Sequence, residues 1–262
     1  MKTSTTNYQT NANPEQPKLY YIWDLRIYVI ILFLIICTDL VAQSGLTVYT
    51  DAGKNNVSDG LFFKTAALWH YTFGNNKVEA GFEINLKNIN NLLFSGFTIN
   101  ASRDLEIKGI PLELQGFYTL TRNPGFLRET NWGTLLKLRY NHFETRIGTN
   151  FRTYAFRDQV IKDFGIDKNA VRILENFNLM YSFTYYVKKD DRQWNAGLSI
   201  TNIDFFIINQ ETNPIISLRG LYNPDSQVRL YTEVWYKTAG ASNLNINYFG
   251  IYFRTGIIWN FN

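Results

Sequence analysis

Polar and apolar side chains alternate at every second position over much of this chain. The stretch KVEAGFEINLK at residues 77–87 places valine, alanine, phenylalanine, isoleucine and leucine on one side, and mainly lysine, glutamate and asparagine on the other. FETRIGTNFRT at 143–153 and VRLYTEVWYK at 228–237 divide in the same way. A period of two is that of a β-strand with two unlike faces, and no helical period persists from Leu46 onward. The pattern therefore predicts an all-β fold.

Twelve such runs can be counted along the chain. They begin near Leu46, Leu61, Lys77, Leu92, Ile110, Trp132, Phe143, Ile173, Trp194, Pro214, Gln227 and Asn245. The first and tenth runs are weakly patterned, so ten or fourteen strands are the alternatives. Residues 43–262 provide about eighteen residues for each strand with its link, and a membrane-spanning strand needs about 9–11.

The links between the runs fall into two alternating sets. The compact set reads GNNK, RDLEIKG, NH, KKDDRQ and NPDSQ, which are rich in turn residues. The other set reads DAGKNNVSDG, NINN, RNPGFLRETN, YAFRDQVIKDFGIDKNAV, the region around INQETNP, and TAGASN, and it is longer on average although NINN is short. The longest link, Tyr154–Val171, is expected to be solvated, with inward folding as a constriction or contact with a partner as its alternatives. Short turns at one end and longer loops at the other are typical of transmembrane β-barrels.

Aromatic residues form 16% of the chain, whereas charged residues form 18%, which is below the usual quarter. Aromatics gather toward the ends of the apolar faces, at Phe63, Trp69, Tyr71, Phe73, Trp132, Tyr140, Tyr181, Phe183, Tyr185 and Trp194. This placement suits aromatic girdles at two membrane interfaces. We therefore predict an antiparallel up-and-down transmembrane β-barrel of about twelve strands with its apolar faces toward lipid. A secreted, soluble β-protein that binds carbohydrate is the alternative.

An uncharged apolar run, IYVIILFLIIC at residues 27–37, precedes the first predicted strand. It is too short for a bilayer-spanning helix, which needs about 20 residues, but it fits the apolar region of a secretory signal peptide. We expect residues 1–42 to be a signal peptide that is removed, and residues 43–262 to be the barrel domain; a retained anchor is the rival. Because the sole cysteine, Cys37, lies in the removed part, the mature protein is expected to lack disulfides and thiolate metal sites. We expect no cofactor and no metal.

The chain ends in RTGIIWNFN, whose pattern resembles the β-signal of bacterial outer-membrane proteins. A polar residue, a glycine, a hydrophobic residue and a final aromatic occur in order as Arg254, Gly256, Trp259 and Phe261, with the extra Asn262 after them. The resemblance implies that these four residues are an assembly signal. It also implies export, capture by the barrel-assembly machinery and insertion into the outer membrane of a Gram-negative bacterium. The implied partners are outer-membrane lipid, that machinery and other envelope proteins.

The polar faces of the predicted strands carry more basic than acidic residues, so we expect an electropositive lumen. The expected lumen-lining residues are Lys64, Glu79, Glu83, Glu113, Lys137, Arg139, Glu144, Arg146, Arg152, Arg229, Glu233 and Arg254. Because a positive constriction favours anions, the pattern predicts a small porin-like channel for small anionic or polar solutes. The alternative is a closed barrel whose inner charges pair across strands, acting as scaffold or anchor of a secretion or uptake complex.

Catalysis has little support in the sequence. After removal of residues 1–42 the only histidines are His70 and His142, and no serine motif resembles a nucleophile elbow. We expect no catalytic residues, and a barrel enzyme is the least favoured alternative. The net charge of +4 does not point to nucleic acid, because the basic residues alternate with apolar ones instead of clustering.

Overall fold

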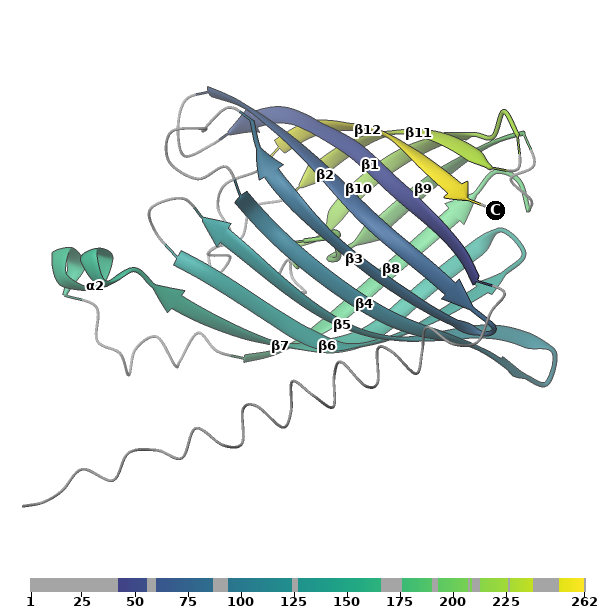
Figure 1. The fold of residues 1–262 in the computed structure, drawn as a ribbon, viewed down its shortest axis with the longest axis horizontal. Coiled ribbons are helices and arrows are strands. Elements are labelled where there is room, and N and C mark those ends of the chain that lie inside the picture. The colour runs from purple at the N-terminus through teal and green to yellow at the C-terminus, as the bar shows by residue number, and fades with distance from the viewer. Residues whose placement is uncertain are drawn as a thin grey trace, which may run out of the picture. The chain divides into compact units, whose positions relative to one another are not determined.

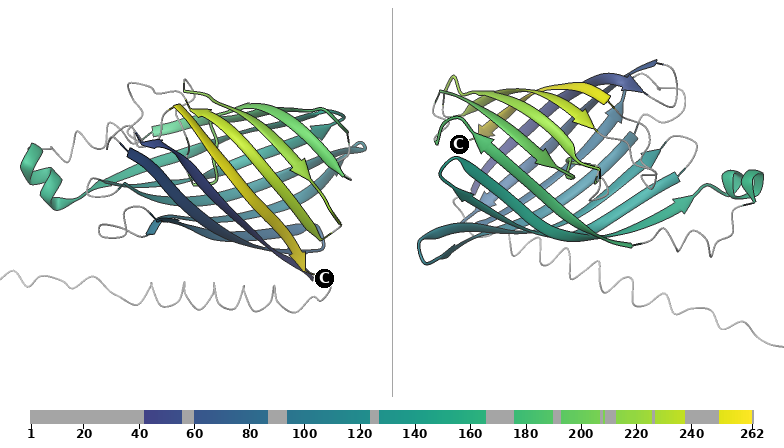
Figure 2. Two further views of the ribbon diagram at one scale, coloured as in Figure 1. Left: turned by 90° about the horizontal axis from the view of Figure 1, so that it is seen from above. Right: turned by 180° about the vertical axis from the view of Figure 1, so that it is seen from behind.

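The computed structural model describes residues 42–55, 60–86, 94–123, 127–165, 176–189, 193–206, 208, 213–225, 227–237 and 250–261. Within these ranges the chain forms a closed barrel of twelve antiparallel strands, each paired with its neighbours in the sequence (Figures 1 and 2). The barrel closes where the last strand pairs with the first. The predicted fold class and strand number are confirmed.

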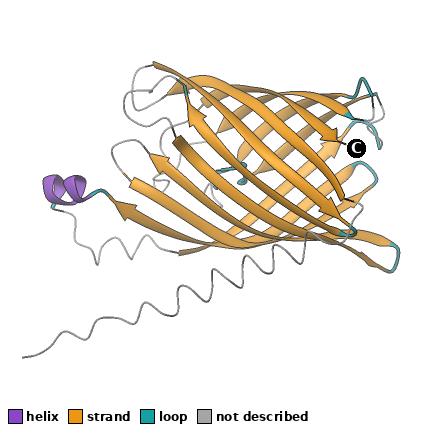
Figure 3. Cartoon of the chain, viewed as in Figure 1, coloured by secondary structure: helices purple, strands orange, loops and turns teal. Residues whose placement is uncertain are grey.

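The strands are β1 (Ala42–Asn55), β2 (Gly60–Phe73), β3 (Asn76–Asn85), β4 (Phe94–Ile107), β5 (Ile110–Asn123), β6 (Leu127–Tyr140), β7 (Phe143–Phe156), β8 (Asn176–Tyr186), β9 (Trp194–Thr201), β10 (Ile215–Tyr222), β11 (Val228–Lys237) and β12 (Gly250–Phe261). A single short helix in the described part of the chain, α2 (Asp158–Phe164), follows β7 (Figure 3). No helix in the described ranges has both the length and the apolar character needed to cross a bilayer.

The two ends of the barrel differ in their links. The start of β1 pairs with the end of β12, Ser44 opposite Phe261, so both strands meet at the end that carries the tight turns. We call it the short-turn end, and the opposite one the long-link end. At the short-turn end Lys108 and Gly109 have φ of 54° and 77°, the left-handed geometry of two-residue hairpin turns. The predicted link RDLEIKG therefore shrinks to two residues, because β4 continues to Ile107.

The outward faces carry the large apolar side chains that were predicted to meet lipid. Near the short-turn end Trp69 packs on Phe261, with ring centroids 5.5 Å apart. Toward the long-link end Phe151 packs between Trp132 and Phe177, at 5.5 and 4.9 Å. Outward rings therefore occur toward both ends of the barrel, as membrane interfaces require.

Several strands are longer than the sequence pattern predicted. β1 runs to Asn55 and β6 begins at Leu127, so residues assigned to the links DAGKNNVSDG and RNPGFLRETN are in strands. Asp51 and Glu129 thereby become inward-facing strand residues that are buried. The predicted signal peptide lies outside the described residues except for Ala42, with which β1 begins, and its removal stays a prediction.

Candidate functional site

The segment between β9 and the predicted outer link around INQETNP folds into the barrel. Residues 202–206 and Ile208, which we call the inward segment, follow β9, and Ile203 forms an isolated bridge with Ile208. Phe206 and Ile208 are each 1% exposed. Phe206 lies against Gly96 of β4, where an added Cβ would come within 3.0 Å of the Phe206 ring. A side chain at this position would therefore require the Phe206 ring to shift by a few tenths of an ångström.

The inward segment crosses the interior from one wall to another. Its described contacts reach β5, β7, β12 and β1, which lie on opposite sides of the barrel in the strand order. The contacts are Thr121 Oγ1 donating to the Phe206 carbonyl, Arg152 Nη2 donating to the Ile208 carbonyl, Arg254 donating to Asp204, and the Tyr49 ring 5.5 Å from the Phe205 ring. The segment therefore narrows the interior at this level.

Arg254 is the centre of the polar contacts beneath the inward segment. It is 1% exposed, and its Nε and Nη2 donate to the two Asp51 oxygens at 2.7 and 2.8 Å. Its Nη1 and Nη2 donate to the two Asp204 oxygens at 2.9 and 3.3 Å. The guanidinium also lies 4.2 Å from the Tyr49 ring centroid and 5.0 Å from that of Trp235. One buried cation thus holds two carboxylates within an aromatic surround.

Other buried charges near the inward segment are also paired. Glu233 accepts hydrogen bonds from Trp235 Nε1 at 2.8 Å and from Arg219 Nε. Arg152 Nε lies 3.2 Å from a Glu129 oxygen. An unpaired buried charge is strongly destabilising, so these ion pairs and hydrogen bonds allow charged side chains to be buried inside the barrel.

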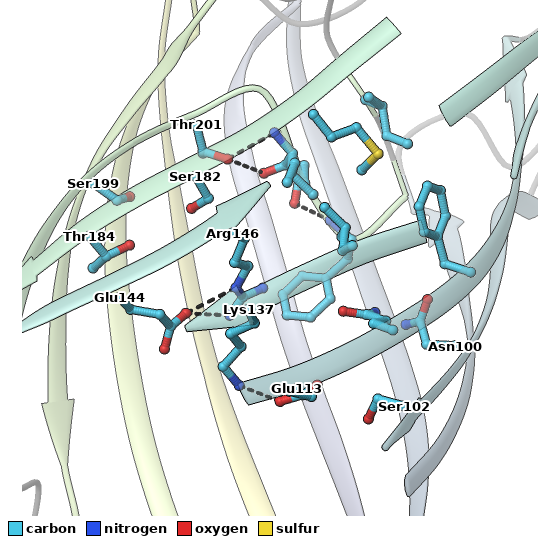
Figure 4. A pocket seen from close by; sticks show the side chains of 18 of the residues that line it. Asn100, Ser102, Glu113, Lys137, Glu144, Arg146, Ser182, Thr184, Ser199 and Thr201 are labelled. Carbon is cyan, nitrogen blue, oxygen red and sulfur yellow. Dashed lines mark hydrogen bonds and ion pairs between the residues drawn. The ribbon is translucent and has the colours of Figure 1, made fainter. Parts of the chain in front are cut away.

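A cavity of about 260 Å³ lies between the inward segment and the short-turn end. Its lining includes hydroxyl side chains of Ser182 and Thr184 from β8 and of Ser199 and Thr201 from β9, together with polar side chains from β3 to β7, among them Asn100, Ser102, Glu113 and Lys137 (Figure 4). The inward segment contributes Ile203, Asp204, Phe205 and Ile208. The cavity is thus polar along its walls and more apolar where the segment bounds it.

Charges in the cavity lining are balanced. Four basic and four acidic residues line it, namely Lys77, Lys137, Arg146 and Arg219 with Glu79, Glu113, Glu144 and Asp204. They pair locally, with Lys137 Nζ 2.6 Å from Glu113, Arg146 Nη2 2.8 Å from Glu144 and Lys77 Nζ 3.6 Å from Glu79. With the inward segment in place, the cavity lining therefore has no net formal charge.

The residues expected to line a lumen separate into three groups. The first group is buried inside the barrel and consists of Lys64, Glu83, Arg152, Glu233 and Arg254. The second group lines the cavity and consists of Glu79, Glu113, Lys137, Glu144 and Arg146. Arg139 and Arg229 lie near the short-turn end, the first 4.9 Å from the Tyr186 ring and the second donating to Asn223 at 3.0 Å. The structure thus brings five of the twelve residues to one cavity.

Within the described ranges, three inward acidic residues were not among the predicted lumen residues, namely Asp51, Glu129 and Asp204. The first two stand in stretches rich in turn residues that nonetheless pair as strands. Asp204 lies in IDFFII, an apolar run between two strands. A run of that composition suits a packed interior better than a solvated loop, and it was the available indication of the inward segment.

The two histidines of the barrel have structural partners. His70 Nε2 lies 3.1 Å from Asn260 Oδ1, and His142 Nδ1 donates to the Tyr186 carbonyl at 2.9 Å. Neither bond involves a nucleophile. In the ranges that the structure describes, no group of three or more histidine, cysteine, aspartate or glutamate residues is placed to hold a metal ion.

The residues of the assembly signal lie on both faces of β12. Arg254 and Gly256 face inward, and a Cβ on Gly256 would come 2.6 Å from the Tyr231 ring and 2.7 Å from the Val48 carbonyl. Trp259 and Phe261 face outward, with ring centroids 5.0 Å apart. The strand end therefore combines tight inner packing with an aromatic outer surface.

Neither a protein-family model nor a curated protein matches the chain. Among solved structures, the COG4313 outer membrane channel from Pseudomonas putida F1 is similar with a TM-score of 0.50 and 10% identity, over 84% of this chain and 95% of that one. The KdgM porin in complex with disordered oligogalacturonate has a TM-score of 0.48 and 12% identity, over 85% and 100%. Outer membrane phospholipase A from Escherichia coli has 0.44 and 11%, over 82% and 92%.

Identities this low compare folds alone. The likeness to the Pseudomonas channel covers 84% of this chain, and the outward apolar faces of the closed barrel suit a lipid surround. This chain therefore has the fold of an outer-membrane β-barrel.

Proposed function

We propose that the protein is a small porin-like channel for small polar or anionic solutes, narrowed by its inward segment. The observation that carries the proposal is the polar cavity of about 260 Å³ inside the barrel. The side chains of Lys77 and Lys137 in its lining are 44% and 28% exposed to solvent, so water reaches them. A barrel filled for stability alone would bury such side chains.

The charge that a solute meets depends on the inward segment. Asp204 is the only acidic residue that the described part of this segment contributes to the cavity lining. If the segment withdraws, four basic and three acidic residues remain around the cavity. Such a lining attracts anions, as positive rings do in other pores. The proposed anion preference therefore belongs to the open form.

Single-channel recording in planar bilayers tests the proposal. The purified protein is compared with a variant in which Gly and Ser replace residues 203–206, and with a control in which they replace Asp158–Phe164 of α2. We expect small conductance steps from the native protein, clearly larger steps with an anion-selective reversal potential from the first variant, and native steps from the control. Absence of conductance in both the native protein and the first variant would exclude a channel.

A closed scaffold or anchor of a secretion or uptake complex is the second candidate. It is favoured by a cluster of buried inner side chains that fills one part of the barrel: Tyr49, Phe62, Ala66, Leu68, Tyr186, Phe206, Ile215, Leu221, Tyr231, Trp235 and Tyr252. A protein with this role would retain a specific partner from the envelope after mild detergent extraction and would not conduct.

We further propose that Arg254, Gly256, Trp259 and Phe261 are read by the barrel-assembly machinery during insertion, and that residues 1–42 are removed on export. The outward aromatic pair and the tight inner packing of β12 are consistent with the first proposal. Mass spectrometry of the amino terminus of protein purified from membranes tests the second, since an intact Met1 would contradict it.

A further inference from the structure

We propose that Asp204 and Phe205 occupy a binding site for a small aromatic carboxylate, so that the inward segment stands in for a solute. The inference rests on the proposed channel function, because it names the class of solute and the residues that recognise it. It is carried by the contacts of Arg254, by the aromatic rings around it and by the charges buried beside it.

Arg254 has one fixed and one exchangeable carboxylate partner. Asp51 stands directly opposite Arg254 in the β1–β12 pairing, so its carboxylate cannot leave without disturbing the closed wall. Asp204 lies outside the strands, on the inward segment, and accepts hydrogen bonds from Nη1 and Nη2 of Arg254. Any carboxylate can accept these two N–H groups, since a guanidinium edge matches the spacing of carboxylate oxygens.

The surroundings of Asp204 fit a ring next to the carboxylate. The Tyr252 hydroxyl donates to Asp204 Oδ2 at 3.4 Å. The ring centroids of Phe205 and Tyr49 are 5.5 Å apart, and the Arg254 guanidinium lies 5.4 Å from the Phe205 centroid. A carboxylate and an aromatic ring thus sit together on one cation, which is the arrangement that a benzoate-like molecule would reproduce.

The same two residues can be reached from the cavity. Asp204, Phe205 and Trp235 all contribute to its lining, whereas Arg254 lies behind them. A solute that enters the cavity from the short-turn end therefore meets the residues that it would replace. Movement of residues 203–206 away from Arg254 would expose the guanidinium edge to that solute.

Buried charge makes the site selective for an anion. Lys237 is also buried and acts electrostatically on Asp204. Without Asp204, the carboxylates that remain near the Arg254 guanidinium are Asp51, at 2.7 Å, and Glu233, at 3.9 Å, and Glu233 also accepts a hydrogen bond from Arg219. Loss of Asp204 therefore makes this buried group of charges more positive by one unit. A bound carboxylate restores the balance, whereas a neutral amide of the same shape does not.

The attached segment competes strongly with a free solute. A tethered group has an effective concentration on the order of millimolar or more, so a carboxylate should bind weakly to the native protein. Removal of the tethered carboxylate and ring should raise the affinity by about tenfold or more. Binding to a variant that lacks them is therefore the direct measurement.

The test is calorimetric titration of the purified barrel in detergent, with benzoate as the probe and benzamide as its neutral match. The native protein is compared with the Asp204→Ala/Phe205→Ala variant and with Asp158→Ala in α2 as a control. We expect benzoate to bind the double variant at least about tenfold more tightly than the native protein or the control, and benzamide to bind none of them tightly. A heat-shift gel verifies that each barrel is folded.

Equal benzoate affinity in the folded double variant and the native protein would overturn the inference, as would equal binding of benzamide. If the double variant does not fold, Asp204→Asn replaces it, because this change keeps the shape and removes the charge. Binding requires no transport, so the two proposals can fail separately. Conductance without benzoate binding removes this site and leaves the channel, and binding without conductance does the reverse.

Discussion

Replacement of Lys64 by Met tests whether the inner charges hold the wall together or face solutes. Lys64 Nζ lies 2.5 Å from Glu83 Oε1, and both side chains are 4% exposed. Ser95 Oγ donates to the same Glu83 oxygen at 2.8 Å. The variant therefore leaves a buried carboxylate without its cation, while the volume of the side chain changes little.

The expected loss follows from the geometry. At 2.5 Å and an effective dielectric constant of about 20, the attraction between the two charges is about 7 kcal/mol, and the desolvation of the ions offsets part of it. Breaking such a pair by removing one partner destabilises a protein by about 3–5 kcal/mol. The double variant Lys64→Met/Glu83→Leu removes both charges and should return to within about 1–2 kcal/mol of the native protein.

Urea unfolding in lipid vesicles, followed by tryptophan fluorescence, measures these free energies. Lys77→Met is the matched control, because its Nζ is 3.6 Å from Glu79 and its side chain is 44% exposed, so it should lose less than about 1 kcal/mol. A loss below about 1 kcal/mol for Lys64→Met, or a double variant no more stable than the single one, would refute the assignment of this pair to the structure of the wall.

Three other predictions concern assembly and the membrane surface. Gly256→Val should lower the free energy of unfolding by about 1–3 kcal/mol, because the added Cβ would collide with the Tyr231 ring. Gly220→Val should be tolerated, since no atom lies nearer than 4.0 Å to its added Cβ. Heat-shift gels measure the folded fraction of both variants. Trp259→Ser/Phe261→Ser should sharply reduce the protein in isolated outer membranes, and undiminished levels would contradict the assembly signal. Leu136→Arg, on the outward face, should lose about 2–4 kcal/mol in vesicle unfolding, and an unchanged stability would show that this face does not meet lipid.

The strand faces could be predicted because a strand that is lipid-exposed on one side must alternate. The run beginning at Lys77 shows this clearly, since its alternation places Glu79 and Glu83 inward, as the structure has them. The ends of the strands were less predictable. Asp51 lies in a stretch rich in Asp, Gly and Asn, yet its backbone pairs with Lys64 and Arg254 on the two neighbouring strands. Pairing on both sides overrides local turn preference.

The candidate site was the hardest part to foresee. Alternation reports only that a residue faces inward, and it does not say which charge pairs with which. Arg254 was placed on the inner face, but its partner Asp204 is fifty positions away and outside the strands. Phe206 of the inward segment packs against Gly96 of β4, a contact between residues distant in the sequence that no local pattern encodes.

The barrel closes through residues that are far apart in the sequence, since Asp51 and Arg254 are separated by 203 positions. We expect contacts of this separation to form late, because the entropy of a very long loop must be overcome before they contribute. Until β12 arrives, β1 is an unpaired edge and Asp51 lacks its cation. As Arg254 also binds Asp204, the step that completes the wall is the same step that anchors the inward segment, so a newly inserted barrel acquires its final circumference and its narrowed interior together.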